Sequence, residues 1–151
     1  YGLTESVGAV TVLPPSSDVD ELDGSVGFPN IGVEVRLVDL EGNLVKGEGE
    51  GELQARSAYN MLGYWNNPEA SAATIVDGWL RTGDLAARTQ DGRYKIVGRL
   101  KEMYKSGGYN VYPREVETVI EEIPGVALAA VVGVADPVWQ EVGIAYVIAD
   151  D

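Results

Sequence analysis

Residues 98–117 read GRLKEMYKSGGYNVYPREVE, and this stretch decides the fold. Its first part is charged and leads to the glycine pair Gly107-Gly108, which is a strong signal for a turn in a short hairpin. Its last part places Pro113 where a helix can begin, because the fixed φ of proline suits the first helical position. The change from a charged linker to a hairpin and then to a helix predicts a domain boundary after Gly98.

Beyond this boundary the sequence predicts a small α+β unit. The helix that starts at Pro113 carries a stripe of apolar residues at the spacing of a helix that covers a sheet: Val116, Val119, Ile120 and Ile123. Pro124-Gly125 ends this helix. The runs 126–134 and 142–148 are continuously apolar and rich in β-branched residues, which is typical of buried strands.

Before the boundary the sequence is rich in strand signals. Apolar and polar residues alternate in 33–38, which predicts a half-buried strand, and a second strand is expected at 51–56. Two further strands should flank the turn at 90–92. Asn67 followed by Pro68 predicts the start of a helix, which we expect to end near Gly78. Residues 13–18 form a loop in this interpretation.

Composition excludes several classes of function. The chain has 11 Lys and Arg against 24 Asp and Glu, and its net charge of -13 disfavours nucleic acid and anionic membranes as partners. Cysteine and histidine are absent, which excludes disulfides, Ser-His-Asp catalysis and the usual zinc sites. No apolar run approaches the roughly 20 residues of a transmembrane segment, and no signal peptide is evident, so we expect a cytoplasmic protein.

Three groups of residues carry the candidate chemistry. Arg99, Lys101 and Lys105 supply cationic donors next to the Gly107-Gly108 backbone, although a solvated hairpin is the alternative. Asp84 follows Thr-Gly and can accept strong hydrogen bonds from hydroxyl groups, or can serve as a turn residue.

The third group lies at the start of the chain. The hydroxyl of Thr4 can donate to phosphate, and the carboxylate of Glu5 suits a hard cation. Without further context, this segment can equally be an ordinary chain end.

Taken together, residues 1–5 (YGLTE), 51–53 (GEL), 61–69 (MLGYWNNPE), 79–84 (WLRTGD) and 98–117 resemble the adenylate-forming (AMP-binding) superfamily, in its order and with its approximate spacing. Segments 51–53 and 61–69 are interpreted as structural. The resemblance implies a β-rich, distorted barrel-like remnant of the large N-terminal AMP-binding domain at 1–98. It implies a hinge and part of the small C-terminal α+β domain at 99–151. Because the chain starts without methionine, we expect it to be a fragment.

The resemblance also assigns roles to residues of the first part. It places Tyr1 along the adenine, with Gly2 in the same nucleotide-binding motif. It has Thr4 bind the α-phosphate and Glu5 bind Mg²⁺, and these two are the expected catalytic residues. Asp84 would bind the ribose hydroxyls.

In the second part, the resemblance implies that Arg99 binds the nucleotide and that Lys101 is the hinge. Lys105, Gly107 and Gly108 would form the loop that meets coenzyme A (CoA) in thioester formation. In such a site only a residue without a side chain lets the backbone approach the cofactor closely.

The function implied by the resemblance is that of an AMP-forming acyl-CoA synthetase of the kind used in fatty acid metabolism. Such an enzyme activates a small carboxylic acid with ATP and Mg²⁺ and passes the acyl group to CoA as co-substrate. The phosphate-cradling loop and the terminal lysine of the family are missing, so we expect the isolated chain to be inactive.

Other functions remain open at this stage. One alternative is an adenylation domain that loads a carrier protein, or a luciferase-like relative. Another is a non-catalytic interaction module that forms a homo-oligomer through apolar surfaces exposed by truncation.

Overall fold

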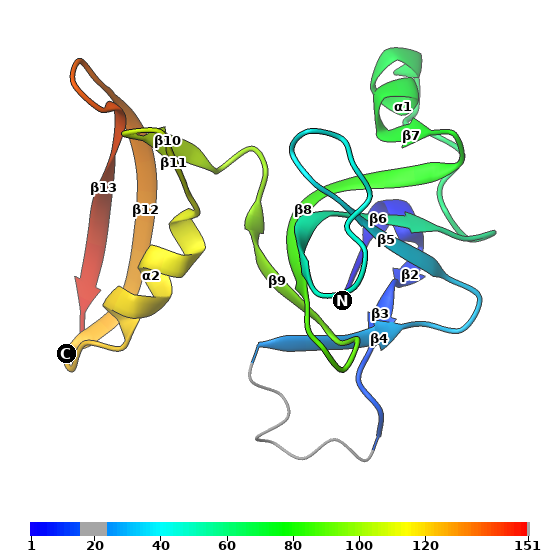
Figure 1. Ribbon diagram of the computed structural model, residues 1–151, viewed down its shortest axis with the longest axis horizontal. Helices are drawn as coiled ribbons and strands as arrows, with labels where there is room; N and C mark the ends of the chain where they lie inside the picture. The colour runs from blue at the N-terminus through cyan, green and yellow to red at the C-terminus, as the bar shows by residue number, and fades with distance from the viewer. Residues whose placement is uncertain (16–23, 151) are drawn as a thin grey trace. The chain divides into compact units, whose positions relative to one another are not determined.

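A computed structural model describes residues 1–15 and 24–150, so the predicted loop at 13–18 lies partly outside the described residues. The chain divides into two compact units, Tyr1–Ile96 and Val97–Asp151 (Figure 1). The division falls two residues before the boundary that the sequence predicts after Gly98. The β-rich α+β fold class that the sequence predicts is confirmed.

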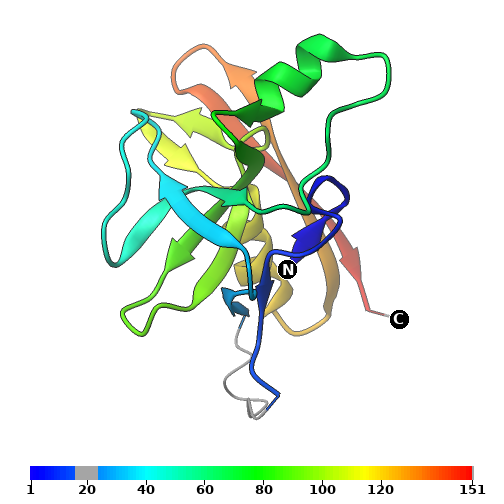
Figure 2. The same ribbon diagram turned by 90° about the vertical axis from the view of Figure 1, so that its right-hand side faces the viewer.

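The first unit contains most of the strands. Its elements are β1 (Gly2–Leu3), η1 (Thr4–Ser6), β2 (Gly8–Ala9), β3 (Thr11–Val12), β4 (Ser25–Pro29), β5 (Glu34–Val38), β6 (Gly49–Arg56), α1 (Pro68–Thr74), β7 (Ile75–Val76), β8 (Trp79–Arg88) and β9 (Tyr94–Arg99), which continues into the second unit after Ile96. The large sheet has the order β3-β4-β9-β8-β6-β5, and β7 pairs with β8. This sheet is strongly curled, in agreement with the predicted distorted barrel (Figure 2).

The pairing of β5 with β6 explains why the two faces of this sheet differ. Leu37 lies opposite Leu53, and both are fully buried in the core. On the other face Arg36 lies opposite Gln54, and the Arg36 Nε donates to the Gln54 Oε1 at 2.9 Å. Because successive side chains of a strand point to opposite faces, one face builds the core and the other carries polar contacts.

The start of the predicted helix is confirmed, but its end is wrong. Asn67 caps α1, because its side-chain oxygen accepts the backbone N–H of Ala70 at 3.0 Å. The helix ends at Thr74 rather than near Gly78, and Ile75-Val76 instead pairs with β8. β-Branched residues lose side-chain freedom in a helix and pack well in strands, which accounts for the early end.

The second unit is a four-stranded antiparallel sheet with one helix. Its elements are β10 (Tyr104–Ser106), β11 (Tyr109–Val111), α2 (Pro113–Glu121), β12 (Val126–Asp136) and β13 (Gln140–Ala149). The sheet order is β11-β10-β13-β12, and α2 lies against β12 (Figure 1). The predicted hairpin, helix and two long strands are all present.

The prediction that both long strands are buried is wrong for one face of β12 and for most of β13, where even Val147, the partner of Ala129, is 51% exposed. Ala129 and Val131 of β12 are buried. The alternating residues are exposed, as are their partners on β13: Leu128, Val132, Ile144, Tyr146 and Ile148. A single helix covers only one side of the sheet, so a continuous apolar run here does not mean burial on both faces.

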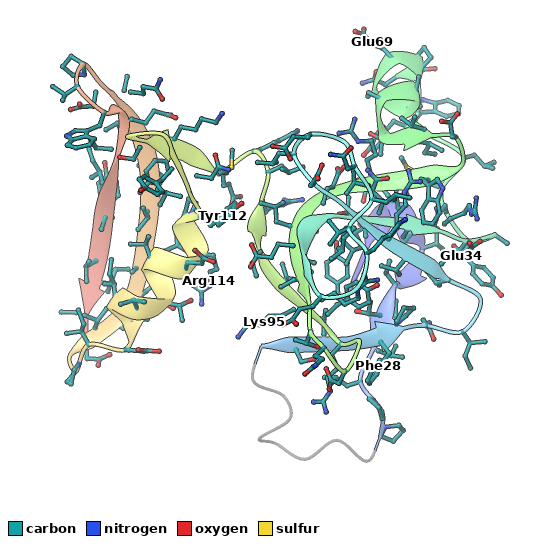
Figure 3. All side chains as sticks on the ribbon, in the orientation of Figure 1. Phe28, Glu34, Glu69, Lys95, Tyr112 and Arg114 are labelled. Carbon is teal, nitrogen blue, oxygen red and sulfur yellow. The ribbon has the colours of Figure 1, made fainter. Side chains whose placement is uncertain are left out.

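Two carboxylates of α2 accept hydrogen bonds from backbone N–H groups on the outer edge of β12. Glu117 Oε1 accepts the backbone N–H of Val131 at 2.9 Å, and Glu121 Oε1 accepts that of Ala129 at 3.2 Å. Arg114, which projects from the start of α2, pairs with both carboxylates (Figure 3). Unpaired donors on an edge strand invite association with other chains, and these contacts block that edge.

The stability of the second unit should therefore depend on Glu121 at acid pH. The hydrogen bond from Arg114, followed by that from the Ala129 backbone, holds the pKa of Glu121 below its ordinary value of 4.5. A depressed pKa contributes stability that is present above the unfolded-state pKa and is lost as pH falls through the folded-state value. Glu121→Gln should remove this part of the acid destabilisation.

The measurement is the urea midpoint of the second unit as a function of pH, followed through amide NMR signals of β12 and β13. Glu122→Gln is the matched control, since Glu122 is the exposed next residue. An acid profile of Glu121→Gln that matches wild type would contradict this role.

Candidate functional site

Asp84 lies on a bulge in β8. Glu52 of β6 pairs with Leu85, and Gln54 pairs with Arg81, so residues 82–84 lie opposite the single residue Leu53. Gly83 at the centre of the bulge has φ 72°, a conformation that glycine adopts without strain. Asp84 is thus presented by a distortion within a strand and not by a loop turn.

Side chains replace the sheet hydrogen bonds that the bulge removes. The Thr82 hydroxyl donates to the Leu53 carbonyl at 2.6 Å and accepts the backbone N–H of Asp84 at 3.1 Å. The backbone N–H of Gly83 donates to Glu52 Oε1 at 3.2 Å. Buried backbone groups without partners are costly, so these contacts fix the shape of the bulge.

Tyr1 and Asp84 are brought together by the fold, although 83 positions separate them. The Tyr1 hydroxyl donates to Asp84 Oδ2 at 2.5 Å. The Tyr1 carbonyl accepts the backbone N–H groups of Val10 and Thr11, at 2.8 and 3.1 Å, which holds the tyrosine in place. Asp84 is buried, with only 8% of the residue exposed.

Thr4 and Glu5 form the short helix η1 directly after β1. Thr4 is exposed, whereas Glu5 is half-buried. Glu5 Oε1 accepts the hydroxyl of Tyr64 at 2.8 Å, and the Glu5 carbonyl accepts the backbone N–H of Met61 at 2.7 Å. In β1, a Cβ on Gly2 would lie 2.4 Å from the Gly8 carbonyl oxygen, so only glycine fits there.

The sequence motifs predict structural roles for Tyr64 and Glu52, yet both residues contact the candidate site. The hydrogen bond to Glu5, together with burial, raises the pKa of Tyr64. Glu52 is buried and supports the Asp84 bulge. The only sequence signals for these residues were the patterns at 51–53 and 61–69.

Arg99 and Lys101 belong to the second unit. Arg99 ends β9, and its carbonyl accepts the backbone N–H groups of Glu102 and Met103 at 3.1 and 3.2 Å, which makes a tight turn. Lys101 is exposed within this turn. Of the hydrogen bonds described for the turn, none uses the backbone N–H of Lys101.

Lys105, Gly107 and Gly108 lie on the β10–β11 hairpin. The backbone N–H of Lys105 donates to Glu141 Oε2 at 2.9 Å, and that of Gly107 donates to the Trp139 carbonyl at 3.0 Å. A Cβ on Gly107 would lie 2.7 Å from the Trp139 ring. Both glycines have a positive φ, but Gly108 differs in that nothing lies within 4 Å of the position where its Cβ would be. Its backbone is therefore open to a ligand.

In the described part of the chain, no group of three or more Asp, Glu, His or Cys side chains could hold a metal ion. Magnesium is often bound through one or two carboxylates together with phosphate oxygens of a substrate. The single carboxylate of Glu5 fits that mode of binding and does not form a dedicated protein cage. None of the helices in residues 1–15 and 24–150 has the length and hydropathy that a membrane span needs.

Comparison with known proteins identifies the family of the chain. Residues 1–65 match the model of the AMP-binding enzyme family, and residues 115–151 match that of the AMP-binding enzyme C-terminal domain. The chain belongs to the AMP-binding enzyme family. The two matches lie in the family's order, one in each compact unit.

Individual relatives are CoA ligases and synthetases. The chain is 44% identical to a feruloyl-CoA synthase of Amycolatopsis sp over all 151 residues, which cover 30% of that protein. It is 45% identical to a long-chain-fatty-acid–CoA ligase of Escherichia coli O157:H7 over 134 residues, covering 89% of the chain and 24% of the relative.

Solved structures of the family have the same fold. The o-succinylbenzoate CoA synthetase of Bacillus subtilis, in complex with its acyl-adenylate intermediate, superposes with a TM-score of 0.90 at 33% identity. The match covers 100% of this chain and 31% of the synthetase. The chain thus spans between 24% and 31% of the length of these relatives.

The contact between Glu5 and Tyr64 can be tested by titration. A phenolate next to a carboxylate is disfavoured, so Glu5→Gln should lower the pKa of Tyr64 towards its ordinary value of 10.0. The measurement is the alkaline titration of the Tyr64 ring by carbon NMR. Glu69→Gln, on the neighbouring helix α1, is the control and should leave the titration unchanged. A Tyr64 pKa that does not respond to Glu5→Gln would show that the two side chains do not interact.

Proposed function

We propose that this chain is part of an AMP-forming acid–thiol ligase. The carboxylate of the acid attacks the α-phosphorus of ATP and releases pyrophosphate, and the CoA thiol then attacks the acyl-adenylate and releases AMP. The observation that carries the proposal is the Asp84 carboxylate, which a bulge presents next to the Tyr1 hydroxyl. The family membership and the named CoA ligases support the same reaction class.

Asp84 is assigned to the ribose hydroxyls of the nucleotide. A carboxylate has two oxygens and can accept both hydroxyls at once, in hydrogen bonds strengthened by its charge. Tyr1, which already donates to Asp84, then lies next to the ribose and along the adenine. Gly2 follows in the same motif, and Arg99 is assigned to the nucleotide as a cationic donor.

Thr4 and Glu5 are assigned to the phosphates. The exposed Thr4 hydroxyl donates to the α-phosphate, and the Glu5 carboxylate would hold Mg²⁺. Such an ion would supply positive charge to offset the repulsion between the nucleotide and the incoming carboxylate. The Tyr64 hydroxyl orients Glu5 through Oε1.

The acid itself is not assigned beyond its class. The relatives are named for different acids, feruloyl in one case and long-chain fatty acids in the other. We therefore propose a small-molecule carboxylic acid as substrate, with ATP and CoA as co-substrates.

Lys101 and Gly108 are assigned to the second half-reaction. One site must first exclude water around ATP and later admit a bulky thiol, so we propose that the small domain turns about Lys101 between the two steps. Gly108 then lines the channel for the pantetheine of CoA, with Lys105 and Gly107 in the same hairpin. The open space around Gly108 supports this role.

Asp84→Ala in the complete ligase tests the assignment of Asp84 to the ribose hydroxyls. Loss of a charge-assisted hydrogen bond should weaken ATP binding by about 1.5 to 3 kcal/mol for each bond lost. The measurement is calorimetric titration of ATP with the folded variant, with Asp77→Ala as a control for the loss of an acidic residue. Unchanged ATP affinity in Asp84→Ala would return Asp84 to a purely structural role.

Lys101→Pro and Gly108→Leu test the second half-reaction. Proline fixes φ near -65° and should hinder the rotation, while the leucine side chain should block the channel. Both variants should form acyl-adenylate but lose thioester formation, measured by pyrophosphate exchange and by single-turnover transfer to CoA. Lys101→Ala is the control for the hinge, because it keeps backbone freedom. Gly108→Ala carries the same strain at positive φ as Gly108→Leu but a much smaller side chain, so it should lose less thioester formation than Gly108→Leu. Equal losses in both half-reactions would argue against the assignment.

A further inference from the structure

Glu52 is a buried carboxylate that contacts the bulge in β8 from the neighbouring strand. Only 6% of the residue is exposed. Glu52 Oε1 accepts the backbone N–H of Gly83 at 3.2 Å. Glu52 Oε2 accepts the Gln54 Nε2 at 2.7 Å and the Arg81 Nε at 3.2 Å. Both oxygens are therefore used, and each makes contact with the strand segment that carries Asp84.

Because Glu52 is buried, its charge must be compensated by contacts with other residues. A buried carboxylate is costly unless a counter-charge and hydrogen bonds accompany it. Arg81 supplies the counter-charge immediately before the bulge, and Gly83 supplies a donor at its centre. The Glu52 carboxylate thus links Arg81, which precedes the bulge, to Gly83, which precedes Asp84.

The Glu52 side chain is itself held by a row of contacts across three strands. Gln54 donates to Glu52 and accepts from Arg36 at 2.9 Å. The guanidinium carbons of Arg36 and Arg56 lie 4.1 and 4.6 Å from the centre of the Trp79 ring. Arg56 in turn pairs with Glu34, labelled at β5 in Figure 3. These contacts limit the positions that the Glu52 carboxylate can adopt.

We infer that Glu52 is a positioning residue for the Asp84 carboxylate, and this inference rests on the proposed role of Asp84 in binding ribose. By holding the backbone N–H of Gly83, Glu52 fixes the bulge that points Asp84 towards Tyr1. Without the Oε1 contact, the Gly83 amide loses its partner and the bulge can relax. The Asp84 side chain would then no longer meet both ribose hydroxyls together.

A positioning role differs measurably from a general contribution to stability. If Glu52 acts through Asp84, its removal should penalise only nucleotides that have ribose hydroxyls. A residue that merely stabilises the fold would affect all nucleotides alike. The informative quantity is the ratio of kcat/KM for ATP to that for 2′,3′-dideoxy-ATP, because the fraction of folded enzyme cancels in this ratio.

The experiment measures that ratio in the complete ligase by acid-dependent pyrophosphate exchange. Asp84→Ala should collapse the ratio, and Glu52→Ala should lower it by on the order of tenfold, the equivalent of one hydrogen bond to a charged group. Glu52→Gln retains an oxygen for Gly83 and should keep more of the ratio than Glu52→Ala. The double variant Glu52→Ala, Asp84→Ala should have the same ratio as Asp84→Ala alone.

Glu50→Ala is the matched control, since Glu50 is an exposed carboxylate on the same strand, and its ratio should equal that of wild type. If Glu52→Ala keeps the wild-type ratio while Asp84→Ala collapses it, the inference is overturned and the ribose assignment stands. If Asp84→Ala also keeps the ratio, both the ribose assignment and the role of Glu52 fail. Parallel losses with both nucleotides in Glu52→Ala would likewise overturn positioning and leave only a structural role.

Discussion

The pairing of residues 82–84 against the single residue Leu53 is the constraint on which the candidate site depends. A regular antiparallel ladder has no room for two extra residues in one strand, so the extra backbone must leave the ladder and find other partners. Thr82 and Glu52 provide these partners, and Gly83 provides the positive φ. The result is an acidic side chain held rigidly within a sheet, where a loop would hold it less firmly.

Local features of the fold could be predicted from the sequence because they depend on neighbouring residues. Asn67 and Pro68 fixed the start of α1, and Pro113 fixed that of α2. Alternating apolar residues identified β5. The end of α1 was missed because Ile75 and Val76 gain more from pairing with β8 than from continuing a short helix, and that pairing depends on a strand further along the chain.

The candidate site could be predicted only in part. Motifs pointed to Tyr1, Glu5 and Asp84 one at a time, but they did not show which side chains meet. The contact of Glu52 with Gly83 spans 31 positions, and that of Glu5 with Tyr64 spans 59. Such contacts depend on strand register and on the path of the chain, which no local pattern encodes. Burial in the second unit was overestimated for a similar reason, since apolar runs do not reveal how many layers cover a sheet.

The most direct test of ribose binding by Asp84 is a crystal structure of the complete ligase with AMP bound. We expect the two carboxylate oxygens of Asp84 to accept hydrogen bonds from the two ribose hydroxyls, while the backbone N–H of Gly83 still donates to Glu52. A structure in which the ribose hydroxyls contact other residues, and Asp84 contacts only Tyr1, would contradict it.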